Sequence, residues 1–427
     1  MKLQYIVLGI FAIIVIIAVL ILAGILPGIR EESELGTDKL IMWGTYPKEL
    51  FKEIISEAKD KNLKLEYVEK SPRAYESDLI NALASGQGPD IWLLSQDLIL
   101  KHKDKIAHIK TALTAREFKD IFIDEGDLLL DKEGIIGLPF IIDPMVLYWN
   151  RDLFQAAGIA SPPKTWDEFI AISQKLTLKD SDGNIIQSGA GLGVFENIKH
   201  SKDIISLLIL QTGNPIINPH SLQVTLGETE GLALNPAESA VRFFTEFSNS
   251  QKISYSWHQA MLQSDQAFLT GKLAMYFGYA SEYNTLRERN PHLNFDVAEV
   301  PQIKDGKVQA TFAKMQSLVI SKQSNYPQAS WKIVKILTEE DIYQKFCDNI
   351  FMPPAQRALL LKQPEDPALA VFYKSAVKSR AWLEPNPEMV SNIFQNMIES
   401  VNTGRQSVHE AVKDAEAQLG ALMKNSF

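Results

Sequence analysis

The chain has 427 residues, of which 46% are hydrophobic and 22% charged, a composition typical of a globular protein and not of a disordered one. Its formal net charge of −9 disfavours nucleic acid and anionic membrane surfaces as partners. The single cysteine, Cys347, excludes an intramolecular disulfide and a thiolate metal cluster, and we interpret it as a buried core residue.

The first hydrophobic segment, Tyr5 to Leu26, contains no charged residue. At ~1.5 Å per helical residue it spans roughly 30 Å, and it is longer than the roughly 7–15 residues of a cleaved signal region. We therefore predict a retained transmembrane signal anchor and tether in residues 1–36. Because Lys2 precedes the segment and glutamates follow it from Glu31, the prediction is a single-pass protein of the cell membrane whose body lies on the extracellular or periplasmic side.

After the tether, strand and helix patterns alternate. The pattern predicts strands and helices in turn at Lys39–Trp43, Leu50–Lys61, Leu63–Val68, Tyr75–Ala84 and Pro89–Leu94. This order is typical of an α/β sheet covered by helices on both faces. The nearby Gly86 and Gly88 precede a strand and do not open a helix, so a nucleotide-binding loop is disfavoured.

Two apolar runs follow, Ile135–Ile142 and Met145–Trp149. Gly137 and Pro139 interrupt the first run, which suggests a backbone that passes between two bodies. Further on, Thr165 with a glutamate three residues later predicts a capping box at the start of a helix.

The second half of the chain continues to mix helix and strand patterns. The alternating glycines of Ser188–Gly193 lack a dinucleotide fingerprint and indicate a tight strand and loop. Helices are expected at 204–210, 238–247 and 329–337, and strands at 295–300 and 316–321, while Gln266–Gly278 combines a helix, a glycine stop and a strand. From Ile342 onward the pattern is mostly helical, with proline-rich loops at 352–354 and 384–387.

Several short motifs occur in a particular order: G-x-G-P-D-I at Gly86–Ile91, G-x-P at Gly137–Pro139, Y-x-N-x-x-L-F at Tyr148–Phe154 and P-x-T-W-x-E at Pro163–Glu168. This order and spacing resembles bacterial extracellular solute-binding proteins of the sugar-binding, maltose-binding-protein-like type, the receptors of ABC importers. The resemblance covers about residues 37–420 in patches. It departs from the family pattern at the start, where a lipidated cysteine is usual and this chain has none.

The resemblance implies an α/β, two-lobe, periplasmic-binding-protein-like fold of type II with a hinge. We expect an N-terminal lobe of residues 37–140 plus 276–322 and a C-terminal lobe of residues 141–275 plus 323–427. The crossings between the lobes are expected near Pro139–Asp143, Tyr276–Gly278 and Ser321–Ser324. The implied function is that of a membrane-anchored monomer that binds a sugar or oligosaccharide, without a cofactor, and delivers it to the permease subunits of an ABC importer by hinge closure.

A sugar site needs aromatic rings for the sugar faces and polar groups for the hydroxyls. From the strand ends and the family resemblance, we predict ligand contacts from Trp43, Tyr46, Tyr75, Ser95, Asp97, Asp143, Gly278, Tyr279 and Trp382, with Tyr283 and Gln96 as further candidates. Other roles remain open: Trp43 could pack in the core, Ser95 or Asp97 could cap a helix, and Asp143 could form an Asx turn. The tryptophan that often follows Gly278 in the family is absent here.

Enzyme signatures are missing from the sequence. The seven histidines are scattered, no H-E-x-x-H or G-x-S-x-G motif occurs, and no metal site or catalytic residue is predicted. Two alternatives stay open. A membrane-anchored glycoside hydrolase could use Asp97 and Asp143 as its carboxyl pair, and the acidic charge would suit a polyamine or cation receptor with the same fold.

Overall fold

The computed structural model describes residues 39–109, 113–228 and 235–425. The predicted anchor, Tyr5–Leu26, lies outside these residues. None of the helices within the described ranges combines the length and the apolar composition needed to cross a membrane.

The described residues form ten strands, joined in the order β2-β1-β3-β9-β4-β7-β6-β5, with β8 paired to β4 and β10 paired to β9. Their bounds are β1 (Leu40–Gly44), β2 (Leu65–Glu69), β3 (Ile91–Ser95), β4 (Leu138–Asn150), β5 (Leu178–Lys179), β6 (Ile185–Ala190), β7 (Leu273–Tyr279), β8 (Phe295–Ala298), β9 (Thr311–Ile320) and β10 (Ser379–Arg380).

The helices of the first half are α2 (Lys52–Asp60), α3 (Tyr75–Ala84), α4 (Ile99–His102), α5 (Ala115–Ile121), α6 (Arg151–Ala156), α7 (Trp166–Leu176) and α8 (Ser201–Leu210). Those of the second half are α9 (Pro236–Glu246), α10 (Ser264–Leu269), α11 (Glu282–Arg289), α12 (Pro327–Leu337), α13 (Glu340–Ile350), α14 (Arg357–Leu360), α15 (Pro367–Val377), α16 (Pro387–Asn402) and α17 (Val408–Asn425). Four short 3-10 helices are η1 (Lys48–Phe51), η2 (Gln96–Leu98), η3 (Lys103–Lys105) and η4 (Asp124–Leu129).

The first lobe is built on three parallel strands. β1 lies between β2 and β3, and Met42 is aligned with both Tyr67 and Ile91. The ring of Phe51 stacks on Tyr67 with centroids 3.7 Å apart, which fixes η1 and α2 beside the sheet. α2 in turn packs against α12, a helix that lies far away in the sequence.

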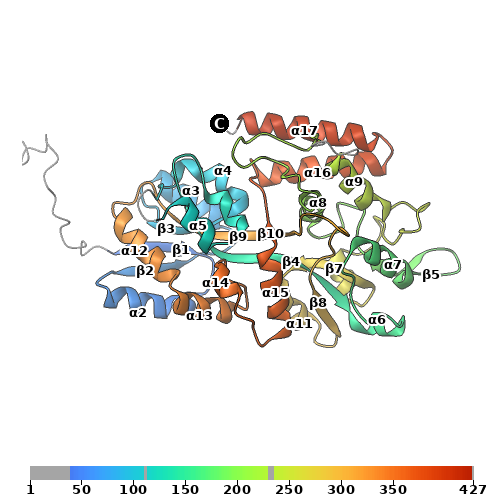
Figure 1. Ribbon diagram of the computed structural model, residues 1–427, viewed down its shortest axis with the longest axis horizontal. Coiled ribbons are helices and arrows are strands. Elements are labelled where there is room, and N and C mark those ends of the chain that lie inside the picture. The colour runs from blue at the N-terminus through green and yellow to red at the C-terminus, as the bar shows by residue number, and fades with distance from the viewer. Residues whose placement is uncertain (1–38, 110–112, 229–234, 426–427) are drawn as a thin grey trace, which may run out of the picture.

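The strand β4 is the central link of the molecule (Figure 1). The sequence suggested two separate apolar runs, but the backbone continues as one strand of 13 residues through both prolines. Leu138–Pro144 pairs with β9, and the rest of the strand pairs with β7 and β8. A register shift between Pro139 and Ile141 accommodates the missing N–H of Pro139. One strand therefore belongs to both lobes.

The second link is β9, which runs antiparallel to β4. Its later residues also pair with β3, so that Ile320 lies opposite Ile91, and its first residues pair with β10. β9 therefore ties the end of the first-lobe sheet to the beginning of the second lobe. Together β4 and β9 form a two-stranded ribbon between the lobes.

These pairings differ from the expected crossings in two places. We expected the chain to return to the first lobe near Tyr276–Gly278, but β7 pairs along the second half of β4, and the return is made by β9. We also expected it to leave again after Ser324, yet α12 packs on α2 and the α13 ring of Phe346 contacts Phe51. An apolar pattern predicts that a strand is buried, but it does not identify the sheet that the strand joins.

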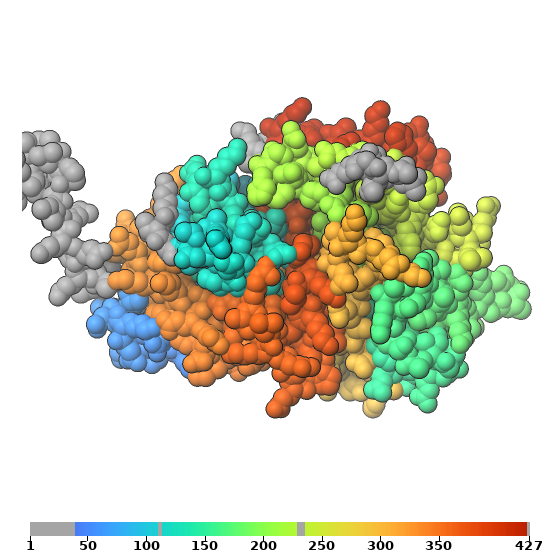
Figure 2. Space-filling model, in the orientation of Figure 1, coloured from blue at the N-terminus to red at the C-terminus, as the bar shows by residue number. Residues whose placement is uncertain are grey.

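The second lobe is formed by the rest of β4, by β5 to β8 and by α6 to α11, and α16 and α17 pack across it (Figure 1). Between the two lobes runs α15, which contacts β4, β8 and β9. In the same orientation, Figure 2 shows the orange-red surface of this region between the teal residues of the first lobe and the green residues of the second.

Helix α7 begins as predicted, with one difference. The Oγ1 of Thr165 accepts a hydrogen bond of 3.3 Å from the N–H of Glu168, so the N-cap is confirmed. The Glu168 carboxylate does not bond back to Thr165 but accepts from the N–H of Lys164 at 2.7 Å. A fully reciprocal capping box occurs instead between Thr114 and Glu117 at α5.

Close packing requires glycine in the stretch Ser188–Gly193. A Cβ added at Gly189, in β6, would lie 2.1 Å from the carbonyl oxygen of Ser173 in α7. This distance is far below van der Waals contact, so the strand and the helix can approach only because the residue is glycine. The prediction of a tight strand, and not a nucleotide loop, is consistent with this arrangement.

We predict that Gly189→Ala lowers the free energy of unfolding by about 1–3 kcal/mol, because the helix backbone has to move to admit one methyl group. Gly420→Ala is the control, since an added Cβ there meets nothing within 4 Å and alanine favours the helix. Thermal unfolding should therefore show a lower melting temperature for the first variant and an equal or higher one for the second. Equal effects of the two substitutions would contradict this packing.

Candidate functional site

Polar side chains from separate segments meet where the two lobes join the β4–β9 ribbon. We call them the interlobe cluster: Asp97 of η2, Asp143 of β4, Lys202 and Asp203 of α8, Tyr279 of β7, Lys314 of β9, and Glu384, which follows β10. Each of these groups interacts with at least one other member.

Lys202 is the cation at the centre of the cluster. Its Nζ donates a hydrogen bond to Glu384 Oε1 and lies 3.2 Å from Asp203 Oδ1. Burial alone would lower the pKa of Lys202, but the two carboxylates raise it above its usual value. Burial would likewise raise the pKa of Asp203, yet Lys202 keeps it below the usual range. The ion pair of Lys202 and Asp203 is therefore charged in the folded protein.

Tyr279 connects this ion pair to the ribbon. Its hydroxyl donates to Asp203 Oδ2 at 2.6 Å, and its backbone carbonyl accepts a 2.7 Å hydrogen bond from the Tyr148 hydroxyl. The Nζ of Lys314 lies 4.3 Å from the centre of the Tyr279 ring. Lys314 is the exposed residue in an otherwise mostly buried strand, so the ribbon turns this side chain out of the sheet.

Asp143 lies opposite Lys314 in the ribbon, as its register partner. It does not form a local Asx turn. Its carboxylate accepts hydrogen bonds from the N–H of Ser281 at 3.0 Å and from the Ser281 hydroxyl at 2.6 Å. Burial raises the pKa of Asp143 to about 6, although both bonds from Ser281 favour the charged form. Asp143 therefore holds the start of α11 against β4.

A second carboxylate, Glu282, holds α11 against α8. It accepts hydrogen bonds from Lys199 Nζ at 2.7 Å and from the Tyr276 hydroxyl at 2.8 Å, and His200 Nε2 lies 2.6 Å away. Burial would raise the pKa of Glu282, but His200 and Lys199 hold it well below the usual range. Both oxygens of the Glu282 carboxylate therefore have partners, and Lys199 balances its negative charge.

A small cavity of 80 Å³ lies in the first lobe beside the ends of β1 and β3. Of the predicted ligand residues, Tyr75 and Ser95 line it, together with Gln316 of β9. The Tyr75 hydroxyl donates to the carbonyl of Leu93 at 2.8 Å, and the Ser95 hydroxyl donates to Gln96 Oε1 at 3.4 Å. Neither Ser95 nor Asp97 caps a helix with its side chain.

The other predicted residues of the first lobe pack against its own side chains. Trp43 is mostly buried at the end of β1, with Lys70 Nζ 3.8 Å from the ring centre. Tyr46 makes an edge contact with Phe346, with ring centroids 5.6 Å apart.

The predicted residues of the second lobe are also covered. Gly278 lies within β7, where a Cβ would come within 2.6 Å of the Tyr276 ring. Only 1% of Trp382 is exposed: its ring stacks on Phe394, and its Nε1 donates to the Ser206 hydroxyl at 3.2 Å. The centre of the same ring lies 5.9 Å from Lys202 Nζ, so Trp382 borders the interlobe cluster.

The sequence did not point to Lys202, Asp203, Lys314 or Glu384. A signal was present in hindsight for the first two, because they form a charged pair in the first turn of the otherwise apolar helix α8. Lys314 is likewise the only charged residue of β9. Charge inside a buried element usually requires a partner or a function.

Two carboxyl oxygens of the cluster have no hydrogen-bond donor among the described residues: Asp97 Oδ1 and Glu384 Oε2. Both are buried, and burial raises the pKa of Glu384 to about 7. No group of three metal-ligating side chains occurs within the described ranges. The groups that remain available to a ligand are therefore hydrogen-bond acceptors, in a cluster that also contains the Tyr279 ring and borders the Trp382 ring.

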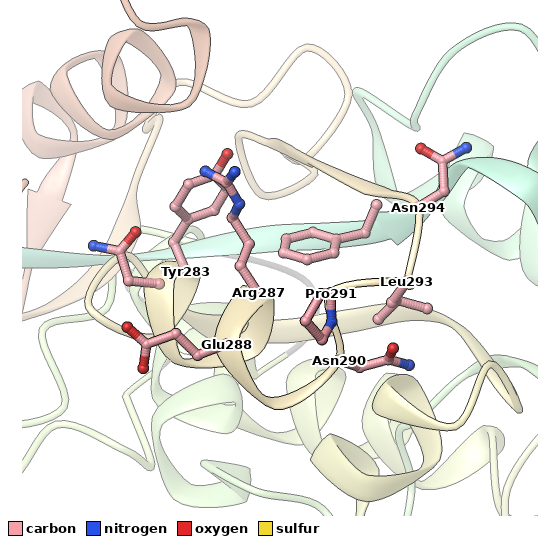
Figure 3. Close-up of a pocket in the computed structure, with 9 residues that line it drawn as sticks. Tyr283, Arg287, Glu288, Asn290, Pro291, Leu293 and Asn294 are labelled. Carbon is pink, nitrogen blue, oxygen red and sulfur yellow. The ribbon is translucent and has the colours of Figure 1, made fainter.

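Two of the larger cavities among the described residues are notable, and both lie outside the cluster. One has a volume of 770 Å³ and is lined by residues of the segment Leu100–His108 and by Pro385, the residue after Glu384. The other, of 570 Å³, is formed by α11 and the turn before β8, and Figure 3 shows Arg287 extending toward the ring of Tyr283 there. Tyr283 also stacks on Phe351 at 5.6 Å, so this candidate residue belongs to a different surface from the cluster.

We predict that Lys202→Met lowers the free energy of unfolding by roughly 3–5 kcal/mol at neutral pH, because it leaves Asp203 and Glu384 buried without their cation. Lys345→Met is the matched control. Its ion pair with Glu53 is exposed, at 60% and 56% of the two side chains, and its loss should cost less than about 1 kcal/mol. Melting temperatures of the two variants test the difference, and a similar fall in both would contradict a stabilising role for the buried pair.

Comparison with known proteins gives a family for most of this chain. Residues 53–370 match the family described as bacterial extracellular solute-binding protein. A protein of Brucella abortus (strain 2308), named only as a binding protein, is 26% identical over 317 residues, which is 72% of this chain and 73% of that protein. The maltodextrin-binding protein MdxE of Bacillus subtilis (strain 168) is 23% identical over 357 residues, or 80% of this chain and 79% of that protein.

A solved structure also resembles the fold. The crystal structure of a cyclo/maltodextrin-binding protein complexed with maltotetraose matches with a TM-score of 0.74 and 20% identity, covering 91% of this chain and 98% of the other. At this identity the match supports the two-lobe α/β architecture and not a particular ligand.

Proposed function

Because the chain belongs to the bacterial extracellular solute-binding proteins, we propose that it binds an oligosaccharide between its lobes and delivers it to an ABC importer. The observation that supports this most directly is the interlobe cluster, where Asp97 and Glu384 each keep an unpartnered oxygen and Lys202, which binds Glu384, lies 5.9 Å from the centre of the Trp382 ring. Sugar hydroxyls are suitable donors for such oxygens, and aromatic rings suit sugar faces.

The family consists of binding proteins, which confirms the prediction that the chain is not an enzyme. It also places the body of the protein on the extracellular or periplasmic side. MdxE is named for maltodextrin, and the similar solved structure holds maltotetraose, so an oligosaccharide is the ligand class that we carry over to this chain.

Binding would work through closure of the lobes. Asp97 belongs to the first lobe, whereas Lys202 and Glu384 belong to segments packed on the second, and β4 and β9 join the two. A ligand that contacts both sides does so fully only when the lobes are closed, so its binding favours the closed form. An importer could then recognise the loaded receptor by the orientation of its lobes.

Within this proposal, the predicted residues have two kinds of role. The proposed ligand contacts on the first-lobe side come from Tyr75, Ser95 and Asp97. Those on the side of the ribbon and the second lobe come from Asp143, Tyr279 and Trp382. We propose that Trp43, Tyr46 and Gly278 support the site by packing, because their surroundings are mostly protein.

We also propose that residues 1–36 anchor the protein through a single membrane helix and that the receptor acts as a monomer beside the importer. An uncleaved amino terminus and retention in the membrane fraction after an alkaline wash are the expected results. A soluble protein with a new amino terminus beyond Leu26 would contradict the anchor.

Calorimetric titration of the full-length protein with maltotetraose and other neutral oligosaccharides tests the proposed function. At least one should bind, and Asp97→Asn should weaken its binding about tenfold, as expected for losing one hydrogen bond to a charged group. Asp104→Asn is the control, because 74% of that side chain is exposed and it pairs with Lys105. The absence of binding by any oligosaccharide, or equal effects of both variants, would contradict the proposal.

A further inference from the structure

We propose that the ligand carries a protonated amino group, as in an oligosaccharide of glucosamine, and that this ammonium group binds between Asp97 and Glu384 in the interlobe cluster. The inference rests on the proposed function, because it names the class of solute for the same site. It makes the receptor one for amino sugars in preference to neutral sugars.

Two buried carboxyl oxygens in the cluster have no hydrogen-bond donor within the described part of the chain. Only 1% of Glu384 is exposed, and its Oε2 receives no hydrogen bond from the described residues. The same holds for the buried Oδ1 of Asp97. A buried acceptor without a donor destabilises the folded protein, and it does so more strongly when it is charged. A ligand that donates hydrogen bonds to both oxygens would therefore satisfy one buried acceptor on each side of the junction between the lobes.

The interlobe cluster contains more acidic than basic side chains. The cluster holds four carboxyl groups, Asp97, Asp143, Asp203 and Glu384, but only two ammonium groups, Lys202 and Lys314. Lys202 is already shared between Asp203 and Glu384.

The nearby Glu282 does not add to this excess of negative charge, because it is paired with Lys199 and His200. Hydroxyl groups would supply donors to the free oxygens, but only a cation also offsets the excess negative charge. Burial raises the pKa of Glu384 to about 7, and the nearby carboxylates of Asp203 and Asp97 add to this rise, so a cation beside Glu384 would stabilise its charged form.

The aromatic rings of the cluster already face ammonium groups. The chain's own lysines already lie against the rings that we expected to hold sugar faces. Lys314 Nζ is 4.3 Å from the centre of Tyr279, and Lys202 Nζ is 5.9 Å from the centre of Trp382. Ammonium groups are attracted to such ring faces, most strongly where water is excluded. Rings and carboxylates together therefore form surroundings suited to a cation.

The test compares two ligands that differ in charge but share size and linkage. The full-length protein is titrated by calorimetry at neutral pH with the β-1,4 disaccharides of glucosamine and of glucose, and with maltotetraose as a second neutral probe. The glucosamine disaccharide should bind at least about tenfold more tightly than the glucose disaccharide, as one desolvated charge pair would give. Glu384→Gln and Asp97→Asn should each reduce that ratio severalfold.

The control variant is Glu340→Gln, which removes an exposed acid outside the cluster and should leave the ratio unchanged. Melting temperatures establish that each variant folds, and Asp97→Asn serves alone if Glu384→Gln does not. Neutral sugars that bind as tightly as the glucosamine disaccharide would overturn the inference and leave the proposed function intact. A preference for glucosamine that persists in both cluster variants would also overturn it, whereas no binding of any saccharide would overturn the proposed function itself.

Discussion

The architecture depends on the two-stranded ribbon of β4 and β9. Both strands belong to the first lobe along one part of their length and contact the second lobe along the other. Their backbone hydrogen bonds therefore persist across the junction, while the side chains on either side belong to different packed bodies. Asp143 and Lys314 lie opposite each other at this point of the ribbon, and α8 and the segment after β10 bring Lys202 and Glu384 to the same place.

The interlobe cluster illustrates why buried charge is informative. Its ion pair of Lys202 and Asp203 is satisfied, and so is Glu282 next to it, but Glu384 and Asp97 each keep an oxygen without a donor. Since leaving buried carboxyl oxygens unpaired lowers stability, a purely structural role accounts poorly for them. A ligand that arrives between the lobes would complete the hydrogen bonding.

The sequence predicted the local structure better than the connections. Helix α3 has the predicted bounds, Cys347 is buried, and the capped start of α7 is present, because each depends on neighbouring residues. The return through β9 was missed, since an apolar pattern does not say which sheet a strand joins. Lys202 and Glu384 are separated by almost half the chain, and only the fold brings them together. Asp97 and Tyr279 were found through the family resemblance, although their role in binding stays a prediction.

We expect the ligand to close the two lobes that the β4–β9 ribbon joins. Small-angle X-ray scattering of the full-length protein, in a contrast-matched detergent and with saturating saccharide, measures this most directly. The radius of gyration of the body should fall when the ligand is added, and the ligand should be recovered unchanged. A constant radius at saturation would contradict closure, and cleavage of the saccharide would contradict the function of a receptor.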